Sequence, residues 1–152
     1  AGAARRSDCL SMCLAVYIAS DRPLPIIDWD PKSPAFYLKQ VGDKAPVLER
    51  FSLPHVYYVG SNHGCGCGFI KDGLTPEEIS PCQGNYASLA RTAREALAGG
   101  ANLELFVCWE GVQAKSPTSM NAVTPSQLED SAFELQELTF FRIHDETELK
   151  LQ

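Results

Sequence analysis

The chain has 152 residues, of which 45% are hydrophobic and 21% are charged. This length and composition are typical of one globular domain and exclude extended disorder. The formal net charge of −6 repels a phosphate backbone, so we expect no nucleic-acid partner. No apolar run approaches the roughly 18 residues needed to cross a bilayer, so we expect no membrane partner either.

Residues 1–11 lack the pattern of a signal peptide. We interpret them as a flexible tail or a non-native extension, and residues 12–152 as a single domain. Without a secretion signal, we expect a cytoplasmic protein whose six cysteines are mostly reduced.

The first half of the chain predicts strands. Residues 12–20 are continuously apolar, which indicates a strand buried on both faces. Residues 35–41 predict an edge strand, residues 47–51 a weakly paired segment, and residues 55–59 a strand rich in β-formers.

The middle of the chain predicts helix. Residues 75–78 (TPEE) combine an N-cap, a first-turn proline and a capping-box glutamate. We expect Pro81 to end that first helix. Apolar residues at helical spacing predict a long helix over residues 85–98, and the glycines that follow end it.

The last third of the chain returns to strand. Residues 102–109 predict a strand, residues 110–123 a loop, residues 124–127 a short helical turn, and residues 133–144 a strand bulged near Glu137. The whole pattern predicts an α+β fold: a mixed, mostly antiparallel sheet of about five strands with one long helix on a face. One strand–helix–strand crossover fits residues 55–109.

The glycine-rich segment of residues 61–69 (SNHGCGCGF) is the strongest candidate for chemistry. Glycines let a backbone adopt positive φ and approach a partner closely, and here they alternate with residues that bind metals. Zinc prefers four thiolate or imidazole ligands. We therefore predict a zinc site, with zinc as the one candidate cofactor. Its predicted ligands are Cys65, Cys67, Cys82 and His63, with His55 and Cys13 as further candidates. Four protein ligands would make the site structural, whereas three would leave a position open for Lewis-acid catalysis.

A second hypothesis is a thiol-dependent enzyme or redox protein that uses Cys65, Cys67 or Cys82. Cys82 is predicted near a helix N-terminus, which lowers the pKa of a thiol. His63 or His55 would act as the base. The sequence does not decide whether the protein is an enzyme.

A third hypothesis is a non-catalytic interaction module with a purely structural loop. Cysteine is among the residue types most often buried, and Cys13 and Cys108 lie in apolar runs where cysteine acts as a small hydrophobe. An open sheet edge would pair with a second copy to give a homo-oligomer. No motif indicates a particular small-molecule ligand.

Overall fold

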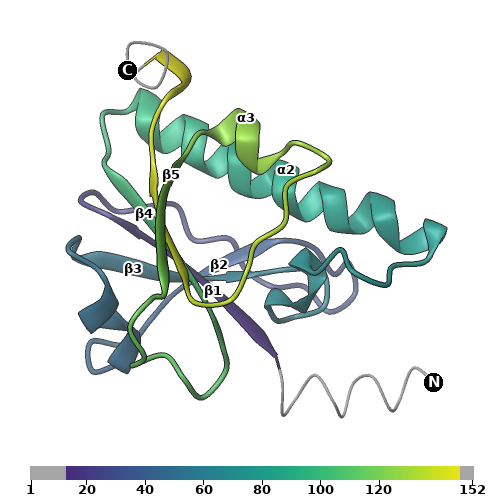
Figure 1. Cartoon of the computed structure of the whole chain (residues 1–152), viewed down its shortest axis with the longest axis horizontal. Helices are drawn as coiled ribbons and strands as arrows, with labels where there is room; N and C mark the ends of the chain where they lie inside the picture. Colours follow the sequence, from purple (N-terminus) through teal and green to yellow (C-terminus); the bar gives the residue numbers. More distant parts are fainter. Residues whose placement is uncertain (1–12, 148–152) are drawn as a thin grey trace.

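The structure is a computed structural model that describes residues 13–147, and it confirms the predicted α+β class (Figure 1). The interpretation of residues 1–11 lies outside the described residues. The strands are β1 (Leu14–Ser20), β2 (Tyr37–Gln40), β3 (His55–Gly60), β4 (Leu103–Trp109), β5 (Ser119–Val123) and β6 (Thr139–Ile143). The α-helices are α2 (Pro76–Ala98) and α3 (Pro125–Leu128), and the 3-10 helices are η1 (Pro46–Arg50) and η2 (Gly66–Phe69).

The six strands form one mixed sheet in the order β2-β3-β1-β4-β6-β5. Neighbouring strands are antiparallel except β5 and β6, which are parallel. Because β3 and β4 both pair antiparallel with β1, they run in the same direction, and α2 makes the predicted crossover between them.

The prediction that residues 110–123 are a loop is wrong for β5. This strand lies at an edge of the sheet, and four of its five residues are exposed. A strand without a buried face needs no alternation of apolar residues, so the usual pattern is missing.

Two other segments also differ from the sequence expectations. Residues 47–51 belong mostly to the 3-10 helix η1, not to a strand. Residues 133–138 precede β6 without joining it, and Leu138 has a positive φ of 55° that extended backbone does not adopt.

Helix α2 begins at the predicted capping box but does not end at Pro81. A proline inside a helix removes one backbone N–H, which leaves a carbonyl four residues earlier without its helical partner. Here that carbonyl belongs to Glu77, and both residues are exposed, so water can bond the carbonyl. The predicted short and long helices are therefore one helix of 23 residues.

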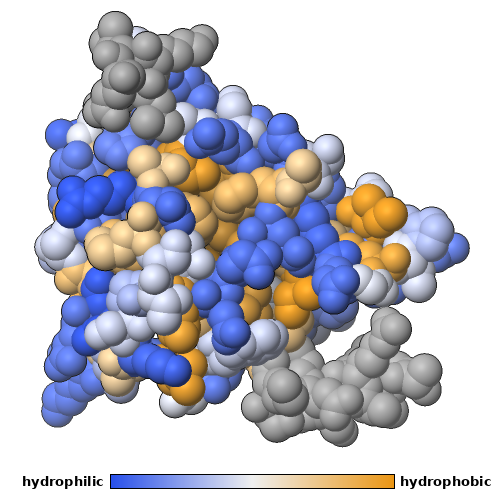
Figure 2. All heavy atoms as spheres, viewed as in Figure 1, coloured by the Kyte–Doolittle hydropathy of each residue, from blue (hydrophilic) through white to orange (hydrophobic). Residues whose placement is uncertain are grey.

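Side chains on the two faces of the sheet form separate clusters, because successive residues of a strand point to opposite faces. Val16 and Ile18 of β1 pack with Leu89 of α2 in the larger cluster. Tyr17 and Phe106 pack on the other face, under residues 41–53. On the face shown in Figure 2, apolar residues lie interspersed among polar ones.

The starts of β1 and β2 and the ends of β3 and β4 lie at the same end of the sheet. The pairing of Leu14 with Trp109 places the start of β1 beside the end of β4. The pairing of Tyr37 with Gly60 places the start of β2 beside the end of β3. The loop that follows β3 therefore leaves the sheet next to the first residues of β1 (Figure 1).

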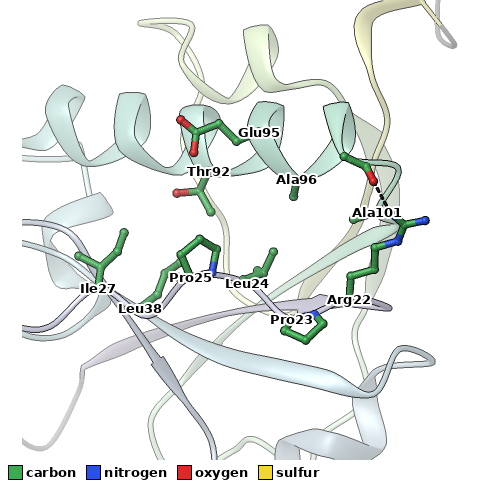
Figure 3. Close-up of a pocket in the computed structure, with 11 residues that line it drawn as sticks. Arg22, Pro23, Leu24, Pro25, Ile27, Leu38, Thr92, Glu95, Ala96 and Ala101 are labelled. Carbon is green, nitrogen blue, oxygen red and sulfur yellow. Dashed lines mark hydrogen bonds between the residues drawn. The ribbon is translucent and has the colours of Figure 1, made fainter.

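The opposite end of β1 borders a groove of about 320 Å³ between α2 and residues 22–27 (Figure 3). The Arg22 guanidinium donates a hydrogen bond to the Gly99 carbonyl at this groove. None of the predicted site residues lines it. Over residues 13–147, no helix combines the length and the apolar character that a membrane span requires.

Removal of the Tyr86 hydroxyl tests how the loop is held, because Tyr86 is a fully buried residue of α2. Its hydroxyl donates to the Phe69 carbonyl at 2.5 Å and accepts from the Leu135 amide at 3.0 Å. We expect Tyr86→Phe to lower the free energy of unfolding by about 1–3 kcal/mol, because two buried polar groups lose their partner. Tyr58→Phe is the matched control and should cost less than about 0.5 kcal/mol. Urea denaturation measures the free energy of unfolding of both variants. Equal losses would contradict the role of the Tyr86 hydroxyl in holding the loop.

Candidate metal centre

Three cysteine sulfur atoms meet at the end of the sheet where β1 begins. The Sγ atoms of Cys13, Cys65 and Cys67 all lie within 4.8 Å of one another. Cys13 is buried, whereas Cys65 and Cys67 are partly buried. The cluster joins the residue before β1 to the loop after β3, and these segments are far apart in the sequence.

The close approach of the loop to β1 depends on Gly66. A Cβ atom at this position would lie 2.4 Å from the Leu14 carbonyl oxygen, so any larger residue would push the loop away. Gly66 stands between the two loop cysteines, and Leu14 follows the third. The absence of a side chain at Gly66 therefore lets the three sulfur atoms meet.

The fully buried Ser61 organises the loop from within. Its hydroxyl donates to the Cys65 carbonyl at 2.5 Å and accepts from the amides of His63 at 3.1 Å and Gly68 at 3.0 Å. A Cβ at Gly68 would lie 2.2 Å from this hydroxyl oxygen. A single small polar residue thus fixes the backbone on both sides of the cysteines.

Helix α2 holds the loop from the outside through Asn85, which is buried. Its side-chain amide donates to Asn62 Oδ1 at 2.8 Å and to the Gly68 carbonyl at 3.1 Å. Its oxygen accepts from the Asn62 amide at 3.3 Å. The loop is therefore tied to the helix as well as to the sheet.

The sulfur of Cys65 accepts a hydrogen bond from the backbone amide of Cys67 at 3.4 Å, at the start of η2. Hydrogen bonds to an ionised acceptor are stronger than those to a neutral one. The local backbone therefore suits a thiolate, which is the form that binds a metal.

Two of the four predicted ligands, Cys65 and Cys67, come together, and Cys13, a further candidate, completes the group of three. Cys82 lies elsewhere, on the buried face of α2, with its Sγ 3.8 Å from the Ile70 carbonyl. His63 is exposed and is not in the group. His55 pairs with Ser20 at the other end of the sheet.

The expected low pKa of Cys82 is contradicted. Burial raises the pKa of this thiol, and the charge of Lys71 offsets only part of that effect. Cys82 is the seventh residue of α2, beyond the first turn where a helix N-terminus stabilises an anion.

Aromatic side chains lie beside the cysteines on the face of the sheet that carries Tyr17, which we call the tyrosine face. The Tyr37 hydroxyl donates to the Gly64 carbonyl at 2.6 Å, and the centroid of its ring lies 5.4 Å from that of Trp29. Tyr58 lies next in this row, with its ring 6.1 Å from Tyr37. Burial raises the pKa of Tyr58 and Tyr37, and the charges of Glu110 and Cys65 raise both further.

The sulfur geometry fits one metal ion. Zinc–sulfur bonds of about 2.3 Å in a tetrahedron place sulfur atoms roughly 3.8 Å apart, and the three atoms here lie within 4.8 Å. Small side-chain rotations therefore suffice to bring three thiolates onto one ion. No protein-family model, curated protein sequence or solved structure matches this chain, so the chemistry rests on this geometry.

Replacement of Gly66 by alanine tests the close approach. We expect Gly66→Ala to weaken zinc binding at least about tenfold, because the added methyl group displaces the loop from β1. Gly84→Ala is the control, since a Cβ there meets nothing within 4 Å and alanine favours the helix. Competition with a chromophoric chelator gives both affinities, and unchanged binding by Gly66→Ala would contradict the role of this contact.

The buried phenol of Tyr17 and the buried thiol of Cys108 make the free energy of unfolding depend on pH. Burial raises the pKa of Cys108 from 9.0 to about 12 and that of Tyr17 from 10.0 to about 12. Above pH 9 the unfolded chain therefore binds fewer protons than the folded one, so stability falls as pH rises towards 12. We expect the urea midpoint of the chelator-treated protein to decrease from pH 8 to pH 10.5. Cys108→Ala should show a shallower decrease, and an equal slope would contradict this cause.

Proposed function

We propose that the protein binds Zn²⁺ through the thiolates of Cys13, Cys65 and Cys67. The observation that carries this proposal is the approach of three sulfur atoms to within 4.8 Å of one another. The neighbouring hydrogen bond to Cys65 Sγ supports thiolate character in the loop.

The donor set favours zinc over other metals. Thiolate sulfur selects Zn²⁺, Cu⁺ or iron–sulfur clusters over magnesium and calcium, which prefer oxygen. Iron–sulfur clusters commonly use four cysteines, and residues 13–147 bring three together. Zinc accepts thiolate ligands both in closed four-ligand sites and in sites with three protein ligands.

A thiolate-rich zinc centre is poorly suited to the activation of water. Three thiolates on Zn²⁺ give a net charge of −1, which disfavours the formation of hydroxide on the ion.

A thiol-redox protein is the second candidate, favoured by the same sulfur distances. Cys65 and Cys67, with Cys13 beside them, would exchange a disulfide with an external thiol. Cys82, which the sequence also suggested for this role, is removed from the three sulfur atoms and shielded by burial.

Zinc titration of single variants tests the main proposal. We expect one zinc ion per chain, and a loss of affinity of at least about 100-fold in Cys13→Ser, Cys65→Ser and Cys67→Ser, because each removes a direct ligand. Cys82→Ser and His63→Ala should retain binding. Circular dichroism verifies folding of each variant.

Two results would overturn this assignment. Absence of zinc binding by the reduced wild-type protein would favour the redox candidate, which glutathione-buffered redox titration then measures. Dependence on Cys82 and His63 instead of Cys13 would place the metal on the four residues suggested by the sequence.

A further inference from the structure

The two outer strands of the sheet differ in how far they invite another strand to pair. At β2, the backbone amide and carbonyl of Leu38 point outward, and both bind Ile27, at 3.0 and 3.1 Å. The exposed Lys39 adds a charge to that edge, and a lysine on an edge strand opposes further pairing. At β5, residues 119–122 are exposed, and Met120 is 67% exposed. The edge at β5 is therefore the more accessible one.

The bonds at the two ends of β5 fix which of its backbone groups point away from the sheet. The Ser119 amide donates to the residue that precedes β6 at 3.3 Å, and the Val123 carbonyl accepts from the residue that follows β6 at 2.9 Å. Both groups thus face β6. Because the direction of the backbone groups alternates along a strand, the amides and carbonyls of Met120 and Ala122 point outward.

The segment around β5 lacks the charges that keep edge strands apart. Residues 116–128 contain no Asp, Glu, Lys or Arg, although the whole chain has a net charge of −6. Pro117 and Pro125 lie outside β5, so neither of them removes an amide from the strand. Natural sheets use charges and prolines within edge strands to prevent association, and β5 has neither.

The sequence of β5 is complementary to itself in the antiparallel direction. A two-fold axis at Asn121, the middle residue of the strand, places Met120 opposite Ala122 of a second copy. Each such pair exchanges two N–H···O=C bonds, so the four outward groups of each copy are satisfied. The large side chain of Met120 then lies beside the small one of Ala122, and the two Asn121 side chains meet on the other face.

Other registers conflict with hydrogen bonds that the chain already makes. An axis at Met120 would pair Ala122 with Thr118, whose amide donates to the Leu138 carbonyl at 2.8 Å. An axis at Ala122 would pair Met120 with residue 124, whose amide donates to a side chain of α3 at 2.9 Å. The register centred on Asn121 uses no amide that is already bonded in this way.

We infer that β5 is an interface through which two copies of this chain form a two-fold dimer, with one sheet continuous through both copies. A strand of five residues contributes a small interface, so the dimer is reversible and concentration-dependent. This inference does not depend on the proposed zinc site.

Sedimentation equilibrium of the full chain tests the interface. A reductant and a chelator are present, so neither disulfides nor a shared metal ion can link two copies. We expect the dimer fraction of the wild-type protein to rise between about 10 µM and 1 mM, the range of weak association. Met120→Lys should raise the dimer dissociation constant at least about tenfold, because it places a charge on the paired edge.

Ile79→Lys is the matched control for this substitution. Ile79 is 56% exposed on α2, so the same change of charge is made on a similarly exposed apolar residue away from β5. The dissociation constant should stay at the wild-type value. Circular dichroism verifies the folding of each variant.

Mixtures of charged variants test the register. Met120→Glu mixed with Ala122→Lys brings opposite charges directly across the axis, whereas Met120→Glu mixed with Met120→Lys places them diagonally. Directly opposed charges attract more strongly, so we expect more heterodimer in the first mixture by native mass spectrometry. More heterodimer in the second mixture would contradict the axis at Asn121.

Two further results would overturn the inference. A wild-type protein that stays monomeric up to about 1 mM would show that the edge at β5 does not pair with a second copy at the affinity of a weak interface. Equal effects of Met120→Lys and Ile79→Lys would place the interface elsewhere. Zinc titration is independent of both results, so this inference and the zinc site can fail separately.

Discussion

The contact between Gly66 and the Leu14 carbonyl is the constraint on which the candidate site depends. The loop passes so close to β1 that a Cβ atom would lie 2.4 Å from that oxygen. Buried backbone cannot simply move aside, because the same strand pairs with neighbours on both sides. The approach of Cys65 and Cys67 to Cys13 follows from this one packing requirement.

Hydrogen bonds keep the loop in that position, together with the burial of Phe69 against Tyr86. Ser61 fixes the loop internally, and Asn85 ties it to α2. Both residues are buried and bonded, so either one replaced by an apolar residue would leave several backbone groups unsatisfied. The helix therefore contributes to the site although it carries none of the three sulfur atoms.

Local patterns predicted the parts of the site that are close in sequence. The alternation of glycine with Cys65 and Cys67 indicated a shaped loop with adjacent ligands. Cys13 could be suggested only as a further candidate, because its place beside the loop depends on which strands pair, and that is a long-range property. Cys82 suggested a ligand by residue type alone, whereas helical periodicity directs its side chain into the core.

The same division between local and long-range information explains which parts of the fold can be predicted from the sequence. Strands β1, β3 and β4 have apolar or β-branched sequences and were predicted from them. Strand β5 is exposed at an edge and has no comparable signal. The sequence predicts a helix end at Pro81 because the rule for proline considers only its immediate neighbours. The helix continues past Pro81 because α2 packs on the sheet over its later turns.

The distribution of the three cysteines along the chain has a consequence for folding. In an unfolded chain Cys65 and Cys67 remain neighbours, but Cys13 is separated from them by about fifty residues of loop, which must be closed at an entropic cost. An ion held by all three would act as a crosslink between the central strand and the loop, and it would bind only after those strands have paired. Metal occupancy would then report the integrity of the sheet, and loss of the ion would accompany the first separation of the loop from β1.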